Sequence, residues 1–228
     1  MIGDPIALQI REKIKRPSKQ LIKRFKCYPT TYIADAQNGA GCLIPAIKPL
    51  DDAMKVCGPA ITTFCGPQDN LGAMAILDFA KEGDVIVISS GGDYHSAKIG
   101  DLWLEMAKKI GVAGGGCDGL VRDKKGLLDV GIPVFTTGIT PNSGFKNGPG
   151  TINTLITCGN IDVAPGDIIS GDLDGVVRTS LPEIKDIENK LTMVGENEKA
   201  AARRLKKGLP LSFWTPSKFK NRVKRLQS

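Results

Sequence analysis

The residues best suited to chemistry stand at the two ends of one short stretch, Gly100 to Asp123. Asp101 opens it and Arg122-Asp123 close it, with twenty residues between the first aspartate and the arginine. A guanidinium presents a planar fork that suits carboxylates and carbonyl oxygens. An aspartate beside it can hold a hard divalent cation, which prefers oxygen ligands and usually keeps several waters. Asp101 could hold one of those waters, so the pattern indicates a site for a small anion and a dication.

A second feature of the stretch is the glycine that precedes its helix. The periodicity predicts a helix from about residue 99 to residue 110, and the first N–H groups of a helix are unpaired and attract anions. Gly100 would leave room for a ligand there, and Leu102 and Trp103 would offer backbone N–H groups to a carboxylate. The alternative is purely structural: a salt bridge from Arg122 to Asp101 or Asp123 uses the same side chains, and spacing does not exclude it.

The surrounding elements predict one α/β domain with a mixed sheet. The almost wholly apolar run Asp84–Ser90 is typical of a strand buried on both faces. Helices are expected over 5–26 (broken at Pro17), 30–37, 69–80, 99–110 and 182–207, and strands over 55–65, 84–90, 151–157, 167–178 and within 112–121 and 131–138. The late cluster of strands favours a mixed sheet over a doubly wound one. We expect a helical N-terminal lead over 1–29, a core over 30–180, and a C-terminal helix with a basic tail over 181–228.

Composition narrows the class of protein. No apolar run approaches the length of a membrane span and the start lacks an apolar leader region, so we expect a cytoplasmic protein that does not bind membranes. The six cysteines form no C-x-x-C pair and lie mostly in apolar segments, which favours buried, reduced thiols over disulfides or a zinc site.

The net charge of +7 is concentrated at the two ends of the chain. Residues 1–26 contain eight Lys or Arg against two acids, and residues 199–228 contain ten against none. Such ends could bind nucleic acid. We favour an amphipathic N-terminal helix and a solvated tail, because no basic face with interleaved aromatic residues and no known nucleic-acid motif accompanies the charge.

Several segments together resemble one known family. Besides Asp101 and Arg122-Asp123 they are "VCGPAITTFCGPQDNL" (56–71), "KEGDVIVIS" (81–89), "AKIGDLWLEMAKKIGVAGGGCDGLVRD" (97–123), "GIPVF" (131–135) and "VAPGDIISGDLDGVV" (163–177). They are similar to the RraA-like family, which includes divalent-metal-dependent 4-hydroxy-4-methyl-2-oxoglutarate aldolases and the ribonuclease E regulator RraA. The resemblance covers about residues 30–208 and implies a swivelling β/β/α fold.

The resemblance also implies roles for individual residues. Asp123 would bind Mg²⁺, Mn²⁺ or another dication directly, and Asp101 would orient water on the metal. Arg122 would contact the keto oxygen of a 2-oxo acid, and the backbone of Gly100, Leu102 and Trp103 would receive its carboxylate. Glu198, with Glu196 as the neighbouring candidate, would reach the site from an adjacent subunit of a homotrimer or hexamer.

This set of roles predicts a lyase. It would release pyruvate from 4-hydroxy-4-methyl-2-oxoglutarate-type substrates, without a lysine Schiff base, and would decarboxylate oxaloacetate at the same site. The substrate's distal half would be recognised by loops such as 66–72 and 138–150.

Two other functions compete with the lyase. A non-catalytic regulator that binds a ribonuclease or another protein is compatible with the family, although Asp101 and Glu198 argue against it. A methyltransferase is disfavoured, because the glycines at 114–116 lead into Arg122-Asp123 and not into a nucleotide-binding helix. His95 is expected to be a solvated loop side chain, and Asp172 and Asp174 to be turn residues rather than ligands.

Overall fold

In the computed structural model, which describes residues 6–209, 211, 219 and 222–224, the chain divides into two compact units, residues 1–191 and 192–228. The first unit contains the sheet, and the second begins within the last helix, α6 (Ile184–Lys206). The three-part division expected from the sequence stays a prediction. No helix in the described part of the chain is long and apolar enough to cross a membrane.

The long strand β3 (Val56–Cys65) organises the sheet. Its residues 60–64 pair in parallel with β4 (Val85–Ser89), and its residues 56–59 pair antiparallel with β12 (Ile168–Asp172). Gly58 and Pro59 lie where the pairing of β3 with β12 ends and its pairing with β4 begins. Gly58 is required because a Cβ there would lie 2.4 Å from the Gly83 carbonyl oxygen.

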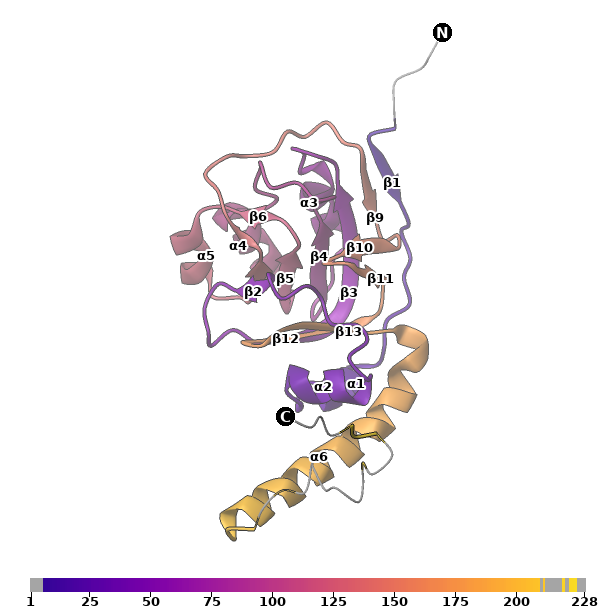
Figure 1. Ribbon diagram of the computed structural model, residues 1–228. Coiled ribbons are helices and arrows are strands. Elements are labelled where there is room, and N and C mark those ends of the chain that lie inside the picture. The colour runs from indigo at the N-terminus through magenta and orange to yellow at the C-terminus, as the bar shows by residue number, and fades with distance from the viewer. Residues whose placement is uncertain (1–5, 210, 212–218, 220–221, 225–228) are drawn as a thin grey trace. The chain divides into compact units, whose positions relative to one another are not determined.

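The central strands of the sheet pair in parallel, and antiparallel pairs lie on both sides of them, as expected for a mixed sheet (Figure 1). β4, β5 (Gly114–Cys117) and β7 (Val134–Thr136) continue the parallel run from β3. The remaining strands are β1 (Leu8–Ile10), β2 (Lys48–Pro49), β6 (Leu120–Val121), β8 (Gly138–Ile139), β9 (Gly150–Ile152), β10 (Ile156–Cys158), β11 (Ile161–Val163) and β13 (Gly175–Thr179). Parallel neighbours need crossover connections, and helices provide them here.

Three helices connect the parallel strands. They are α3 (Leu71–Ala75), α4 (Asp101–Ile110) and α5 (Lys124–Val130). The predicted helix over 69–80 is shorter than expected, since a 3₁₀ turn over Ile76–Asp78 replaces its second half. The helix α5 was not predicted from the sequence. The predicted helices over 30–37 and 182–207 correspond to α2 (Thr30–Ala36) and α6.

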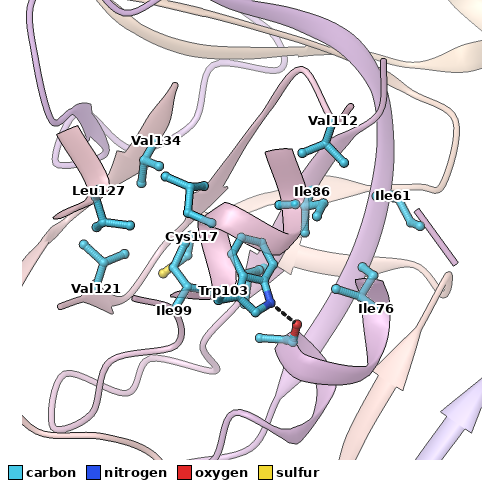
Figure 2. Close-up of a cluster of buried hydrophobic side chains, with 14 of the residues drawn as sticks. Ile61, Ile76, Ile86, Ile99, Trp103, Val112, Cys117, Val121, Leu127 and Val134 are labelled. Atoms are coloured by element: carbon cyan, nitrogen blue, oxygen red, sulfur yellow. Dashed lines mark hydrogen bonds between the residues drawn. The ribbon is translucent and has the colours of Figure 1, made fainter. Parts of the chain in front are cut away.

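β4 is buried on both faces, as its apolar sequence predicts. Ile86 and Ile88 belong to one hydrophobic cluster with Trp103 of α4, and Val85 and Val87 belong to a second cluster on the other face. Figure 2 shows the first cluster, in which the Trp103 indole N–H donates to the Ala73 carbonyl at 2.6 Å. Each fully buried side chain of this size contributes about 1.5–3 kcal/mol to folding. The two layers therefore hold β4, and the loop after it, in place.

The helical lead expected over 5–26 is confirmed only for α1 (Lys19–Phe25). Leu8–Ile10 instead form β1, which pairs in parallel with β9, and residues 11–18 are extended. Arg16 fixes this extended segment by a bidentate ion pair with the buried Asp84, with N–O distances of 2.8 Å. An amphipathic pattern interrupted by a proline predicts a helix only weakly. Pairing with β9 and the ion pair with the buried Asp84 stabilise the non-helical conformation more strongly.

All six cysteines are free. Cys57, Cys65, Cys117 and Cys158 are buried, as expected, whereas Cys27 and Cys42 are exposed. Burial raises the pKa of the Cys65 thiol to about 11 and that of Cys117 to about 12. Because a thiolate is the reactive form of cysteine, these buried thiols are unreactive at neutral pH.

Candidate active site

The sequence-predicted residues of the first unit meet beside the carboxyl ends of the parallel strands. Arg122 and Asp123 follow β6, and Gly100 precedes α4. Two backbone hydrogen bonds join these segments: the Lys98 N–H donates to the Leu120 carbonyl at 2.9 Å, and the Arg122 N–H donates to the Ile99 carbonyl at 3.0 Å. Ligands of α/β proteins commonly bind at this edge of the sheet.

Gly100 leaves a space directly beside the charged pair. A Cβ placed on it would lie 2.7 Å from Asp123 Oδ2 and 3.2 Å from both Cγ and Nε of Arg122. The backbone of Gly100 is extended (φ −141°), so no left-handed conformation requires glycine here. The missing side chain therefore matters for the space it leaves.

The structural alternative of a salt bridge is also present. Arg122 Nε lies 3.1 Å from Asp123 Oδ2, and the two side chains are 42% and 44% exposed. Exposed ion pairs of this kind contribute about 0–1 kcal/mol to stability. Asp123 adopts a left-handed backbone conformation (φ 59°), which is uncommon outside glycine and is concentrated at functional sites. The pair thus contributes little to the fold and faces solvent.

Asp101 lies at the other side of the same region, against α5. Its Oδ1 accepts a hydrogen bond from the Leu102 N–H at 2.7 Å. A Cβ on Gly126 would lie 2.4 Å from Asp101 Oδ2, so the carboxylate packs directly on the first turn of α5. Trp103 is buried and its side chain belongs to the core, which leaves only its backbone N–H for a ligand. Leu102 is 77% exposed.

A pocket of about 220 Å³ opens at these residues. Gly100, Asp101, Leu102, Trp103 and Arg122 line one part of it. The other lining residues come from the start of α3, from α4 and the segment before it, and from the loop before β9: Asn70, Met74, Ala97, Ile99, Met106, Ser143 and Lys146. The side-chain Oδ1 of Asn70 is buried and has no hydrogen-bond partner among the residues that the structure describes. Arg122 and Lys146 give the pocket two cationic groups, which suits an anionic ligand with a carboxylate at each end.

The residues around Asp123 fit a divalent cation that keeps most of its waters. The described part of the chain contains no group of three or more acidic, histidine or cysteine side chains suited to a metal. A dication such as Mg²⁺ is, however, often bound by one or two carboxylates and by water and substrate oxygens. Asp123 Oδ2 borders the space above Gly100, and Asp101 is the second carboxylate at the same pocket. Asp123 would hold the cation.

Glu198 and Glu196 belong to the second unit, where both are exposed on α6. Their contribution to the site stays a prediction.

The other acidic and histidine residues singled out from the sequence have local roles. His95 has a 79% exposed side chain, as expected for a solvated loop residue. Asp172 accepts hydrogen bonds from the Thr30 N–H and hydroxyl at 2.9 and 2.6 Å and from the Asp174 N–H at 3.0 Å. Asp172 and Asp174 therefore belong to the β12–β13 hairpin, as predicted for turn residues.

Comparison with known proteins gives the same assignment as the motifs. The RraA-like family model, described as Aldolase/RraA, matches residues 30–178. This chain belongs to the RraA-like family. A relative from Halalkalibacterium halodurans, provisionally named 4-hydroxy-4-methyl-2-oxoglutarate aldolase, is 43% identical over 155 residues, which are 68% of this chain and 74% of the relative.

Solved structures of RraA proteins share the fold. RraAS2 of Streptomyces coelicolor, an unusual member of the RNase ES inhibitor RraA family, superposes with a TM-score of 0.75 at 24% identity, covering 83% of this chain and 99% of that chain. The RNA-processing inhibitor RraA of Thermus thermophilus has a TM-score of 0.61 at 25% identity, covering 67% and 92%. The mixed α/β RraA-like fold predicted from the sequence is thus confirmed.

Proposed function

We propose that this RraA-like protein is a divalent-metal-dependent lyase of the class II aldolase type, which cleaves 4-hydroxy-4-methyl-2-oxoglutarate or a closely similar 2-oxo acid to pyruvate. The observation that carries the proposal is that Arg122 and Asp123 border the side-chain-free space at Gly100, and that Gly100, Arg122 and Asp101 line one pocket. The aldolase name of the Halalkalibacterium halodurans relative supports the same reaction class.

The cleavage breaks the C3–C4 bond of the substrate. The electron pair of that bond passes to the pyruvyl half as an enolate, and the 4-hydroxyl loses its proton to become a ketone. The enolate then takes up a proton at C3, which gives pyruvate. A dication held by Asp123 would supply Lewis-acid stabilisation of the charge on the keto oxygen. The Arg122 guanidinium, at the same pocket, binds the keto oxygen and stabilises the enolate as charge develops.

The other residues orient the substrate and move the proton. The Trp103 N–H at the start of α4 receives the substrate carboxylate, because helix N-termini stabilise anions. The Leu102 N–H donates to Asp101 Oδ1 in the structure and would join it by exchanging that carboxylate for the one of the substrate. Asp101 accepts the 4-hydroxyl proton, directly or through one water, with Glu198 of an adjacent subunit as the second acid. Asn70 and Lys146 also line the pocket, and the distal half of the substrate would bind beside them.

Oxaloacetate decarboxylation should occur at the same site. Its C3–C4 bond breaks with release of carbon dioxide, and the same pyruvyl enolate forms. No hydroxyl proton has to be removed, so Asp101 is needed for aldol cleavage and dispensable for decarboxylation.

The test is pyruvate release from 4-hydroxy-4-methyl-2-oxoglutarate by purified protein with and without Mg²⁺ or Mn²⁺. Asp123→Asn should lower kcat/KM by about 100-fold or more, because the charge that holds the cation is lost. Asp129→Asn is the matched control, since Asp129 is an exposed aspartate further along α5. Unchanged turnover in Asp123→Asn, or equal turnover after chelation of divalent metals, would reject the proposal.

A second candidate is a non-catalytic regulator that binds a ribonuclease, and the named function of the Thermus thermophilus neighbour favours it. The same assay separates the two functions. A regulator would release no pyruvate with any of the metals, and it would change the rate of a purified ribonuclease acting on RNA. An aldolase without a regulatory role would leave that rate unchanged.

A further inference from the structure

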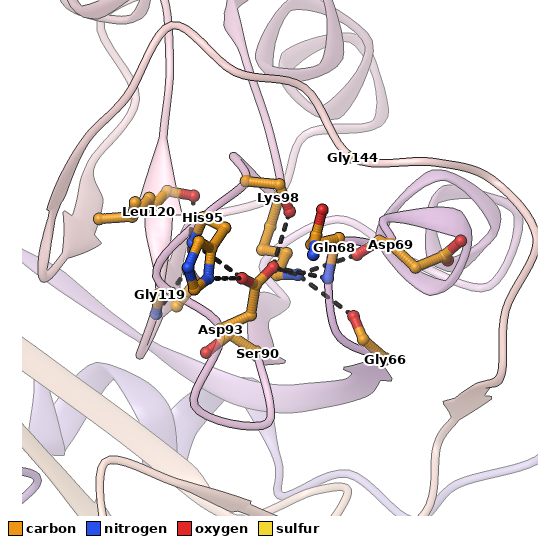
Figure 3. Close-up of polar contacts among 12 residues, drawn as sticks. Gly66, Gln68, Asp69, Ser90, Asp93, His95, Lys98, Gly119, Leu120 and Gly144 are labelled. Atoms are coloured by element: carbon orange, nitrogen blue, oxygen red, sulfur yellow. Dashed lines mark hydrogen bonds and ion pairs between the residues drawn. The ribbon is translucent and has the colours of Figure 1, made fainter.

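A buried lysine lies behind the pocket, in a network that the proposed reaction does not use. Lys98 is fully buried, two residues before Gly100. Its ammonium donates to Asp93 Oδ2 at 2.8 Å, to the Asp69 carbonyl at 3.0 Å and to the Gly66 carbonyl at 3.3 Å (Figure 3). All three of its hydrogen-bond donors are therefore used, and two of them hold the backbone of one turn, residues 66–70.

Asp93 completes the network from the loop after β4. Besides Lys98, its carboxylate accepts hydrogen bonds from the Ser96 hydroxyl at 2.7 Å and from the N–H groups of Gln68 and His95, both at 2.8 Å. Burial by itself would raise the pKa of Asp93, but these four donors hold it well below its usual range. The carboxylate is thus ionised at neutral pH and is a fixed anchor for the 66–70 turn.

The turn at residues 66–70 is hydrogen-bonded to a second segment, residues 142–149, and holds it in position. The Phe145 N–H donates to the Gln68 carbonyl at 2.7 Å, and the Asn70 N–H donates to the Phe145 carbonyl at 2.8 Å. Asp69 Oδ2 accepts from the N–H groups of Asn147 and Gly148 at 2.6 and 3.0 Å. Gly144 allows this close approach, because a Cβ there would lie 3.1 Å from the Asn70 backbone nitrogen.

Both segments contribute residues to the lining of the pocket. Asn70 comes from the turn, and Ser143 and Lys146 come from the second segment. We propose that Lys98 and Asp93 are positioning residues, whose buried ion pair fixes Asn70 and Lys146 at the distance required by the distal half of a two-carboxylate 2-oxo acid. This inference rests on the proposed function for the identity of the substrate, and on the hydrogen-bond network for the positioning itself.

A purely structural role would not need an ion pair at this place. Burying two charges costs several kcal/mol in desolvation, and apolar side chains of similar volume are often equally stable. An apolar side chain cannot, however, hold the Gly66 and Asp69 carbonyls. A displacement of about 1 Å in a substrate-positioning group can lower the rate by up to about 100-fold. Loss of Lys98 should therefore affect recognition of the distal half more than the chemistry at Arg122.

Lys98→Met tests this with two substrates. Cleavage of 4-hydroxy-4-methyl-2-oxoglutarate needs the whole pocket, whereas exchange of pyruvate methyl protons for deuterium needs only the part around Arg122. We expect KM for cleavage to rise about tenfold or more, with kcat of pyruvate exchange changed less than about threefold. Amide hydrogen exchange in peptides covering 66–72 and 143–148 should become faster, and this readout does not depend on activity.

Arg16→Met is the matched control. It removes the cationic partner of Asp84, another buried aspartate, at the opposite end of β4. It should lower stability without changing the ratio of the two activities. Should Lys98→Met fail to fold, Ser96→Ala removes a single hydrogen bond to Asp93, and it should raise KM for cleavage by a smaller factor, about threefold.

Four results separate the possible failures. An unchanged KM for cleavage, or a parallel loss of cleavage and pyruvate exchange, would overturn the positioning role. Unchanged hydrogen exchange in both segments would overturn it as well. A wild-type protein that neither cleaves the substrate nor exchanges pyruvate protons rejects the proposed function, and hydrogen exchange in the two segments then decides the positioning role by itself.

Discussion

The absence of a side chain at Gly100 directly affects the positions of the proposed catalytic groups Arg122 and Asp123. Its backbone conformation is open to any residue, and the nearest atoms to an added Cβ would be the flexible ends of Asp123 and Arg122. An added methyl group would therefore displace these side chains and leave the backbone in place. A substitution here separates the geometry of the site from the stability of the fold.

We expect Gly100→Ala to lower kcat/KM for pyruvate release by about 100-fold, because Asp123 Oδ2 has to move away from the space it borders. The free energy of unfolding should change by less than about 1 kcal/mol. Steady-state kinetics and urea unfolding measure the two quantities. Gly115→Ala is the control, since its Cβ would meet nothing closer than 3.5 Å. Retained activity in Gly100→Ala would show that the space is not used.

At the scale of elements, the contact between α4 and α5 holds Asp101 in the site. The two helices approach where the Asp101 carboxylate packs against Gly126, within α5. An alanine usually stabilises a helix interior by about 0.5–1 kcal/mol relative to glycine. Here the expected sign is reversed, because the new Cβ would overlap the Asp101 carboxylate.

Gly126→Ala should therefore lower the free energy of unfolding by about 1–3 kcal/mol, as overpacking does. Aldol cleavage should fall more than oxaloacetate decarboxylation, because only the former needs the proton acceptor. Chemical denaturation and the two activity assays check both expectations. Higher stability in this variant would mean that α5 can shift away from α4 without cost.

At the scale of the whole molecule, the role predicted for Glu198 would connect the site to oligomerisation. The RraA-like resemblance implies a homotrimer or hexamer in which this glutamate reaches a neighbouring site. Leu102, Met106 and Phe145 are 77%, 47% and 65% exposed, and the first two line the pocket. Apolar side chains exposed beside a site often lie at a subunit interface. The exposed leucine and methionine thus support the prediction that a second copy covers this face.

Complementation tests this arrangement. Asp123→Asn and Glu198→Gln should each be nearly inactive alone, and light scattering should give the mass of a trimer or hexamer. Co-expressed in equal amounts, the two variants should recover about a quarter of wild-type activity, because random mixing pairs an intact Asp123 with an intact Glu198 at that frequency. No recovery in a mixture shown to contain both variants would contradict a site shared between subunits.

Local sequence patterns predicted the candidate site residues Gly100, Arg122 and Asp123. Arg122 and Asp123 follow a glycine-rich strand, and Gly100 precedes an amphipathic helix, so short-range signals place all three at element boundaries. The same signals predicted β3, β4, α4 and the β12–β13 hairpin. They did not predict β1, whose formation depends on the sheet edge at β9, or α5, whose formation depends on packing against α4. The other side of the pocket was predicted only as loops, without particular residues.

By itself, the sequence determined the RraA-like family and the mixed α/β fold and predicted the charged residues of the candidate site, because these depend on residue types and on spacing along the chain. Only the tertiary structure decided that Asn70, Ser143 and Lys146 complete the pocket and that Lys98 and Asp93 stand behind them. Those residues come from segments more than twenty positions apart, and the hydrogen bonds and burial that unite them exist only once the sheet has brought the loops together.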